Sequence, residues 1–131
     1  MTITLDASAG LEIVLKREKA IHFKKLLNNT KTVYSSDLYK VETANVIWKY
    51  VRAGLIAKEI AIDLLQLTLD LVDEYQDIAD YNAEALQEAI KLNHSVYDML
   101  YLSLARRTAS VLLSTDKHLL VLAEQQGLQT G

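Results

Sequence analysis

Residues 94–119 read HSVYDMLYLSLARRTASVLLSTDKHL, and this stretch decides the class of fold. Ser95 is a good helix N-cap, and the pattern that follows predicts a helix over residues 96–108. The apolar run at 111–113 predicts a buried strand, and a short helix follows it over residues 117–125. Asp98 lies in the first turn of the first helix, and Asp116 stands at the exit of the strand.

The rest of the chain repeats this alternation of strands and helices. Further strands are predicted over residues 2–5, 32–34 and 74–79, and further helices over residues 11–15, 17–28, 38–53, 58–73 and 83–91. Ser8 is a candidate N-cap for the first of these helices, and Asn28-Asn29 is a candidate left-handed end for the second. Strands separated by helices throughout predict an α/β fold with a parallel sheet, and 131 residues suit a single domain over 1–131.

Composition excludes several classes of protein. The chain has no cysteine, so it has neither a disulfide framework nor a thiolate for zinc or catalysis. No apolar run reaches the roughly 18 residues that a membrane span needs, and the N-terminus lacks the pattern of a secretory signal. We therefore expect a cytoplasmic protein without a membrane-spanning segment.

Charge is unevenly distributed along the chain, although the net charge is only −3. Residues 16–31 hold six Lys or Arg against one Glu, whereas residues 59–90 hold nine acids and no Lys or Arg. This asymmetry could steer an anion to one end of the molecule, or it could reflect two solvated helix faces.

The helices between residues 38 and 72 carry more apolar residues than one core face needs. The first has an apolar stripe, and the second is apolar on more than one face. We expect this excess to form a homodimer interface around Trp48, Leu55, Ile60 and Leu71. The stripe consists of Leu38, Val41, Ala44, Trp48, Val51 and Leu55.

Four acids are candidates for one shared site. Asp6 and Asp116 follow strands, so both should lie at the carboxyl edge of the parallel sheet, where ligands gather. Asp98 begins an apolar helix face, where desolvation should raise its pKa unless a cation compensates. Glu42 lies on the flank of its helix, one turn from Asn45. Asp6 and Asp116 would also serve as helix caps and Glu42 as a solvated acid, so the residues alone leave these alternatives open.

Converging carboxylates repel one another unless they bind a hard divalent cation. Mg²⁺ and Mn²⁺ prefer carboxylate oxygen and water, and a chain with no cysteine and three histidines suits them better than zinc. Such ions activate water and clamp a phosphodiester, so the reaction class indicated is metal-assisted hydrolysis of a phosphate ester.

The acids and their neighbours resemble the motifs of the PIN domain family, which includes the toxin nucleases of bacterial and archaeal toxin–antitoxin pairs. The resemblance covers essentially the whole chain. It is carried, in order, by ITLDAS at 3–8, ETAN at 42–45, YDMLYLSLA at 97–105 and STDKHL at 114–119.

The resemblance implies a three-layer α/β/α sandwich with a central parallel sheet and a metal-dependent endoribonuclease that uses Mg²⁺ or Mn²⁺. It assigns metal binding to Asp6, Glu42, Asp98 and Asp116, and support of that site to Ser114 and Asn45. It further implies an RNA substrate, a homodimer and a cognate antitoxin.

Two alternatives remain beside this interpretation. A catalytically silent PIN-like module would bind only a protein or RNA partner. A phosphoryl-accepting receiver domain would have adjacent acids after its first strand, whereas Asp6 stands alone. For an RNA substrate, phosphate contacts would come from the basic segment 16–31 together with Arg106, Arg107 and Lys117.

Overall fold

A central sheet of four parallel strands organises the protein, which a computed structural model describes over all residues 1–131. The strand order is β3-β2-β1-β4, and every pairing is parallel. The strands are β1 (Thr2–Leu5), β2 (Thr32–Ser36), β3 (Glu74–Gln76) and β4 (Val111–Leu113). The predicted α/β class with a parallel sheet is confirmed.

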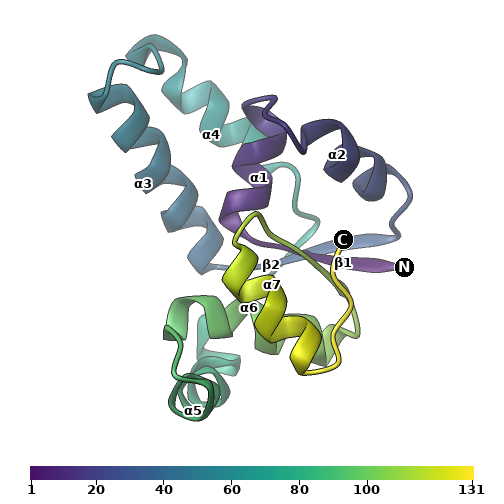
Figure 1. The fold of residues 1–131 in the computed structure, drawn as a ribbon. Helices are drawn as coiled ribbons and strands as arrows, with labels where there is room; N and C mark the ends of the chain where they lie inside the picture. The colour runs from purple at the N-terminus through teal and green to yellow at the C-terminus, as the bar shows by residue number, and fades with distance from the viewer.

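Seven α-helices cover the two faces of this sheet (Figure 1). Helices α1 to α4 lie on one face and α5 to α7 on the other, which gives three α/β/α layers. The helices are α1 (Ala7–Val14), α2 (Ala20–Asn28), α3 (Leu38–Arg52), α4 (Ala61–Leu69), α5 (Asn82–Leu92), α6 (Val96–Thr108) and α7 (Lys117–Gln125). Short 3₁₀ turns at Lys58–Ile60 and Ile78–Asp80 precede α4 and α5. No helix combines the length and the apolar composition that crossing a membrane would require.

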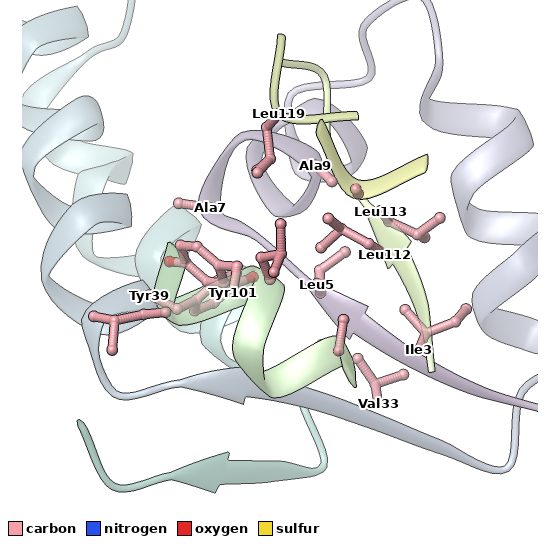
Figure 2. Close-up of a cluster of buried hydrophobic side chains, with 14 of the residues drawn as sticks. Ile3, Leu5, Ala7, Ala9, Val33, Tyr39, Tyr101, Leu112, Leu113 and Leu119 are labelled. Carbon is pink, nitrogen blue, oxygen red and sulfur yellow. The ribbon is translucent and has the colours of Figure 1, made fainter. Parts of the chain in front are cut away.

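The core lies between the sheet and its helices. Leu5 of β1 pairs with Leu113 of β4 at the carboxyl edge, and both side chains are fully buried. Figure 2 shows these residues with Leu112 from β4 and with Tyr39 and Tyr101 from α3 and α6. The β-branched and leucine side chains suit the two-sided burial of a parallel sheet.

The start of α1 corrects one prediction and connects the core to the candidate site. The helix begins at Ala7, four residues earlier than predicted, and its N-cap is Asp6 rather than Ser8. The Ala9 N–H donates to Asp6 Oδ1 over 2.9 Å. The end of α2 also differs, because Asn29 has φ −100° and is not left-handed.

The buried face of α3 is the second correction. Tyr39, Thr43 and Ile47 face the core, whereas Val41 and Trp48 of the predicted stripe are exposed. Polar groups hold the buried face in place, since the Tyr39 hydroxyl donates to the Thr68 carbonyl and the Thr43 hydroxyl donates to the Tyr39 carbonyl. Val41, Trp48 and Leu55 of the apolar stripe are exposed, whereas Leu38 packs against the core.

Candidate active site

Asp6 stands at the carboxyl end of β1, directly beside β4. Its backbone N–H donates to the Leu113 carbonyl over 3.1 Å, which fixes the residue at the sheet edge. Besides the Ala9 amide, the Ser8 hydroxyl donates to Asp6 Oδ1 over 2.6 Å. The hydrogen bonds from Ser8 and Ala9 both use Oδ1, and the Ser114 hydroxyl is a further hydrogen-bond partner of Asp6.

Asp116 follows β4 and caps α7 in the same manner. Its Oδ1 accepts from the N–H groups of His118 and Leu119, at 3.0 and 3.2 Å. The Ser114 hydroxyl oxygen accepts from the Asp116 N–H over 3.0 Å, and that hydroxyl is fully buried. Oδ2 of Asp116 has no hydrogen-bond partner in the protein, so this aspartate caps a helix and still presents an unpaired oxygen.

Glu42 reaches the same edge from α3. The Tyr101 hydroxyl, from α6 on the other face of the sheet, donates to Glu42 Oε1 over 2.6 Å. Glu42 Oε2 has no protein partner. This hydrogen bond joins two residues that are 59 positions apart in the chain, and it orients the carboxylate.

Asp98 lies in the first turn of α6, whose N-cap is Ser95 as predicted. Its Oδ2 is 3.4 Å from His94 Nδ1, and its side chain is about one-quarter exposed. The His94 ring packs edge-on against His118 at a centroid distance of 4.7 Å. These two rings connect the segment before Asp98 with the segment after Asp116.

The four carboxylates line one cavity of about 340 Å³ at the carboxyl edge of the sheet. Six of its other lining residues carry polar side chains: Ser8, Glu12, Arg17, Tyr50, Tyr101 and Thr115. Glu42 and Asp116 each have one carboxylate oxygen that accepts hydrogen bonds from the protein and one that has no hydrogen-bond partner. Asp6 is also hydrogen-bonded by Ser114, and Asp98 lies between Ser95 and His94. An unpaired carboxylate oxygen facing a shared cavity is available to a cation or to a proton donor.

Burial changes the proton affinity of three of these acids. Desolvation raises the pKa of Asp6 to about 6, against hydrogen bonds from Ser114, Ser8 and Ala9 that lower it. Desolvation also raises the pKa of Glu42 and of Asp98, and the Asp98 charge adds to the rise at Glu42. The elevated pKa expected for Asp98 is confirmed, and the carboxylates repel one another as predicted.

The donor set suits a hard divalent cation, since it consists of carboxylate oxygens without a thiolate. As the side chains stand, no three His, Asp or Glu groups are placed to hold one ion together. Mg²⁺ commonly uses one or two carboxylates and keeps several waters, so the chemistry of the site fits this ion even though a full protein cage is absent.

Two supporting residues were named from the sequence, and the structure brings only one of them to the site. Ser114 is hydrogen-bonded to Asp6 and to the Asp116 N–H, whereas Asn45 is exposed on α3 and does not line the cavity. Val46, one turn after Glu42, occupies the cavity wall instead. Counting 3.6 residues per turn had placed Asn45 on the same flank as Glu42, but in the structure Asn45 lies outside the cavity.

Sequence reasoning missed the roles of Ser8 and Tyr101, and it included Arg17 only as one member of the basic segment 16–31 expected to contact phosphate. Ser8 donates to Asp6 and accepts from the Thr115 N–H over 2.9 Å, so it connects both strand exits. Tyr101 is three residues from Asp98, and this helical spacing was the signal that it shares the face of that acid. Arg17 carried no comparable signal within a segment of six cations.

Two predicted phosphate-binding residues are already paired. Arg106 donates to Glu88 over 2.7 Å, and Arg107 donates to Glu84 over 2.7 Å. Neither arginine lines the cavity. Their charges are neutralised by the acidic helix α5, so they are poor candidates for contact with an anion at the site.

Comparison with known proteins agrees with this architecture. The chain is 26% identical over 121 residues to Ribonuclease VapC3 of Pyrobaculum aerophilum, covering 91% of this chain and 92% of that protein. Its fold is similar to that of PAE2754 from Pyrobaculum aerophilum, with a TM-score of 0.73, 22% identity and coverage of 92% and 78% of the two chains. It is also similar to VapBC2 from Rickettsia felis, solved bound to a promoter DNA fragment, with a TM-score of 0.70, 17% identity and coverage of 100% and 98%. The model of the PIN domain matches residues 3–125, and the chain therefore belongs to the PIN domain family.

Proposed function

We propose that this protein is a metal-dependent endoribonuclease that hydrolyses RNA phosphodiester bonds and acts as the toxin of a toxin–antitoxin pair. The observation that carries the proposal is the set of four carboxylates that line one cavity. Membership of the PIN domain family and similarity to a relative named as a ribonuclease support the same activity.

In the proposed mechanism, Asp6, Glu42, Asp98 and Asp116 would hold Mg²⁺ or Mn²⁺. When bound, such an ion lowers the pKa of water and stabilises the negative charge that develops on the phosphate. The water oxygen bonds to phosphorus, its proton passes to solvent or to a carboxylate, and the bond from phosphorus to the 3′ oxygen breaks as that oxygen takes up a proton from solvent. The products are a 5′-phosphate and a 3′-hydroxyl.

The chain's own residues orient the acids for this reaction. The Ser8 hydroxyl and the Ala9 N–H fix one oxygen of Asp6, and the Tyr101 hydroxyl fixes one oxygen of Glu42. Because those oxygens are engaged, the remaining ones are aligned before a ligand arrives. Hydrogen-bonded partners of this kind commonly change metal affinity or activity 10- to 100-fold.

Single-turnover cleavage of RNA tests the proposal. Wild type with Mg²⁺ or Mn²⁺ should cut RNA and leave 5′-phosphate ends, and both Asp6→Asn and Asp98→Asn should be slower by at least about 100-fold, because several kcal/mol of charge stabilisation is lost. If both variants cut as fast as wild type, the assignment of the site fails.

A catalytically silent binding module is the alternative, and one observation favours it. No three acidic or histidine side chains are placed to hold one ion together. Such a protein would bind RNA or a protein partner without cutting. The cleavage assay separates the two, since a silent module leaves RNA intact at every metal concentration.

A second copy of the chain and an antitoxin are the proposed protein partners. A groove of about 250 Å³ between α3 and α4 is lined only by apolar residues, which supports the homodimer. Leu71, named in the predicted interface, packs against the core instead. The antitoxin rests on the similarity to VapBC2 and on the family resemblance.

A further inference from the structure

Arg17 occupies a fixed position at the rim of the acidic cavity. Helix α1 ends at Val14, and Lys16 turns the chain with a left-handed φ of 54°. The Arg17 N–H then donates to the Glu12 carbonyl over 3.0 Å, and the Arg17 carbonyl accepts from the Ala20 N–H over 3.0 Å. The backbone of this residue is therefore held on both sides.

The guanidinium group rests on an aromatic ring rather than on an acid. Its central carbon lies 4.8 Å from the centroid of the Tyr50 ring, which comes from α3 across the cavity. No carboxylate lies within ion-pair distance, although Glu12 lines the same cavity. Glu12 Oε2 instead accepts from the Lys19 N–H over 2.9 Å. Cation–π contact orients the Arg17 side chain while leaving its N–H donors unused.

The charge around the cavity is mostly negative, and Arg17 is the exception. Arg17 is the sole cation among the lining residues, which include five carboxylates. A polyanion entering here meets repulsion unless a positive group contacts it. A guanidinium with free donors matches the geometry of a phosphate, which it can bind through two parallel hydrogen bonds.

We propose that Arg17, held against Tyr50, binds a backbone phosphate of the RNA next to the phosphodiester that the four acids address. This inference rests on the proposed ribonuclease function. Arg17 acts as a substrate-positioning residue, because it contacts the RNA away from the reacting atoms. The competing explanation is that Arg17 only offsets the negative potential of the cavity.

Salt-dependent binding of a fluorescently labelled single-stranded RNA separates these explanations. Every protein in the assay carries Asp98→Asn, which should block cleavage, and binding is followed by anisotropy in Mg²⁺ over a series of salt concentrations. Adding Arg17→Gln should raise Kd about tenfold and reduce the slope of log Kd against log salt by about 0.7, the value for one phosphate contact on a single strand. Arg17→Lys should recover the slope but only part of the affinity, since lysine cannot bind a phosphate through two parallel bonds.

Lys25→Gln is the matched control. Lys25 belongs to the same basic segment and is exposed, but it does not line the acidic cavity. This variant should change Kd less than about twofold, and all variants should melt within a few degrees of the reference protein.

Three results would overturn the inference: an unchanged Kd and slope for Arg17→Gln, an equal loss for Lys25→Gln, or an absence of RNA binding. A wild-type protein that binds RNA through Arg17 but never cleaves it would refute the ribonuclease and leave the phosphate contact standing. Wild-type cleavage with no effect of Arg17→Gln on binding would refute only the role of Arg17.

Discussion

The acidic cavity and the apolar surface of α3 and α4 depart from ordinary folding in opposite ways. The cavity buries charge, with Asp6 only 5% exposed, whereas the apolar surface leaves Trp48 52% and Ile62 74% exposed. Neither the burial of a charged side chain nor the exposure of large apolar side chains stabilises the folded chain by itself. The contrast agrees with the two proposals made above, a cation in the cavity and an apolar partner on the surface.

The two regions also differ in what they do to stability. The pKa of Asp6 rises from its ordinary value of 3.8 to about 6. This corresponds to about 3 kcal/mol in favour of the protonated form. An ionised Asp6 at neutral pH therefore opposes folding by a sizeable part of the 5–15 kcal/mol typical of a domain. The apolar surface carries no comparable penalty within one chain, and its effect is on association.

The largest expected effect is a loss of dimer affinity when the apolar surface is changed. Ile62→Asp places a charge in the proposed interface and should weaken the dimer at least about 100-fold, because an unpaired charge is costly to bury. Ile90→Asp is the matched control, since Ile90 of α5 is 75% exposed and Ile62 is 74% exposed. Sedimentation velocity at micromolar concentration measures both. If the wild type is monomeric, or if the two variants associate equally well, the apolar surface is not a dimer interface, and the contrast between the two regions is lost.

The next largest expected effect is a loss of cleavage rate when the hydrogen bond from Tyr101 to Glu42 is removed. Tyr101→Phe should slow RNA cleavage 10- to 100-fold, because Glu42 loses the partner that orients it. Tyr39→Phe is the control, since the Tyr39 hydroxyl is equally buried but donates to the Thr68 carbonyl. Both variants should lose about 1 kcal/mol of stability. Equal rates for the two variants would show that Tyr101 is only structural.

The smallest effect is on stability. Because folding raises the pKa of Asp6, the folded state binds the proton more tightly, and stability should fall as pH rises from about 4 to about 6 and then level off. Asp6→Asn keeps the cap and removes the charge, so it should stabilise the metal-free protein at pH 7 by about 1–3 kcal/mol.

Denaturant unfolding in a chelating buffer measures this change. Asp116→Asn is the control, since Asp116 caps α7 in the same way but is only half-buried, and it should change stability by less than about 0.5 kcal/mol. Lower stability of Asp6→Asn at pH 7 would contradict the account of the cavity.

Local patterns predicted the sheet and the strand exits well. The strands at 2–5 and 111–113, and the caps at Ser95 and Asp116, agree with the structure because short-range propensity and burial act together there. The family motifs named all four acids, and the structure places them around one cavity.

Long-range packing could not be predicted in the same way. The outward stripe of α3 was found by helical spacing, but spacing does not say which face is buried, and the buried face proved to contain Tyr39 and Thr43. The pairing of Tyr101 with Glu42 depends on two helices meeting across the sheet edge, and no local pattern reports that. The contact between Arg17 and Tyr50 could not be predicted for the same reason, because Tyr50 lies on another helix.

Isothermal titration of Mn²⁺ into the wild type and into Asp98→Asn at pH 7 tests the central claim most directly. If the cavity exists to hold a cation, the wild type should bind Mn²⁺, and the variant should bind it at least about tenfold more weakly because a carboxylate ligand is lost. Absence of Mn²⁺ binding by the wild type, or equal affinity in the two proteins, would contradict the claim that these acids form a metal site.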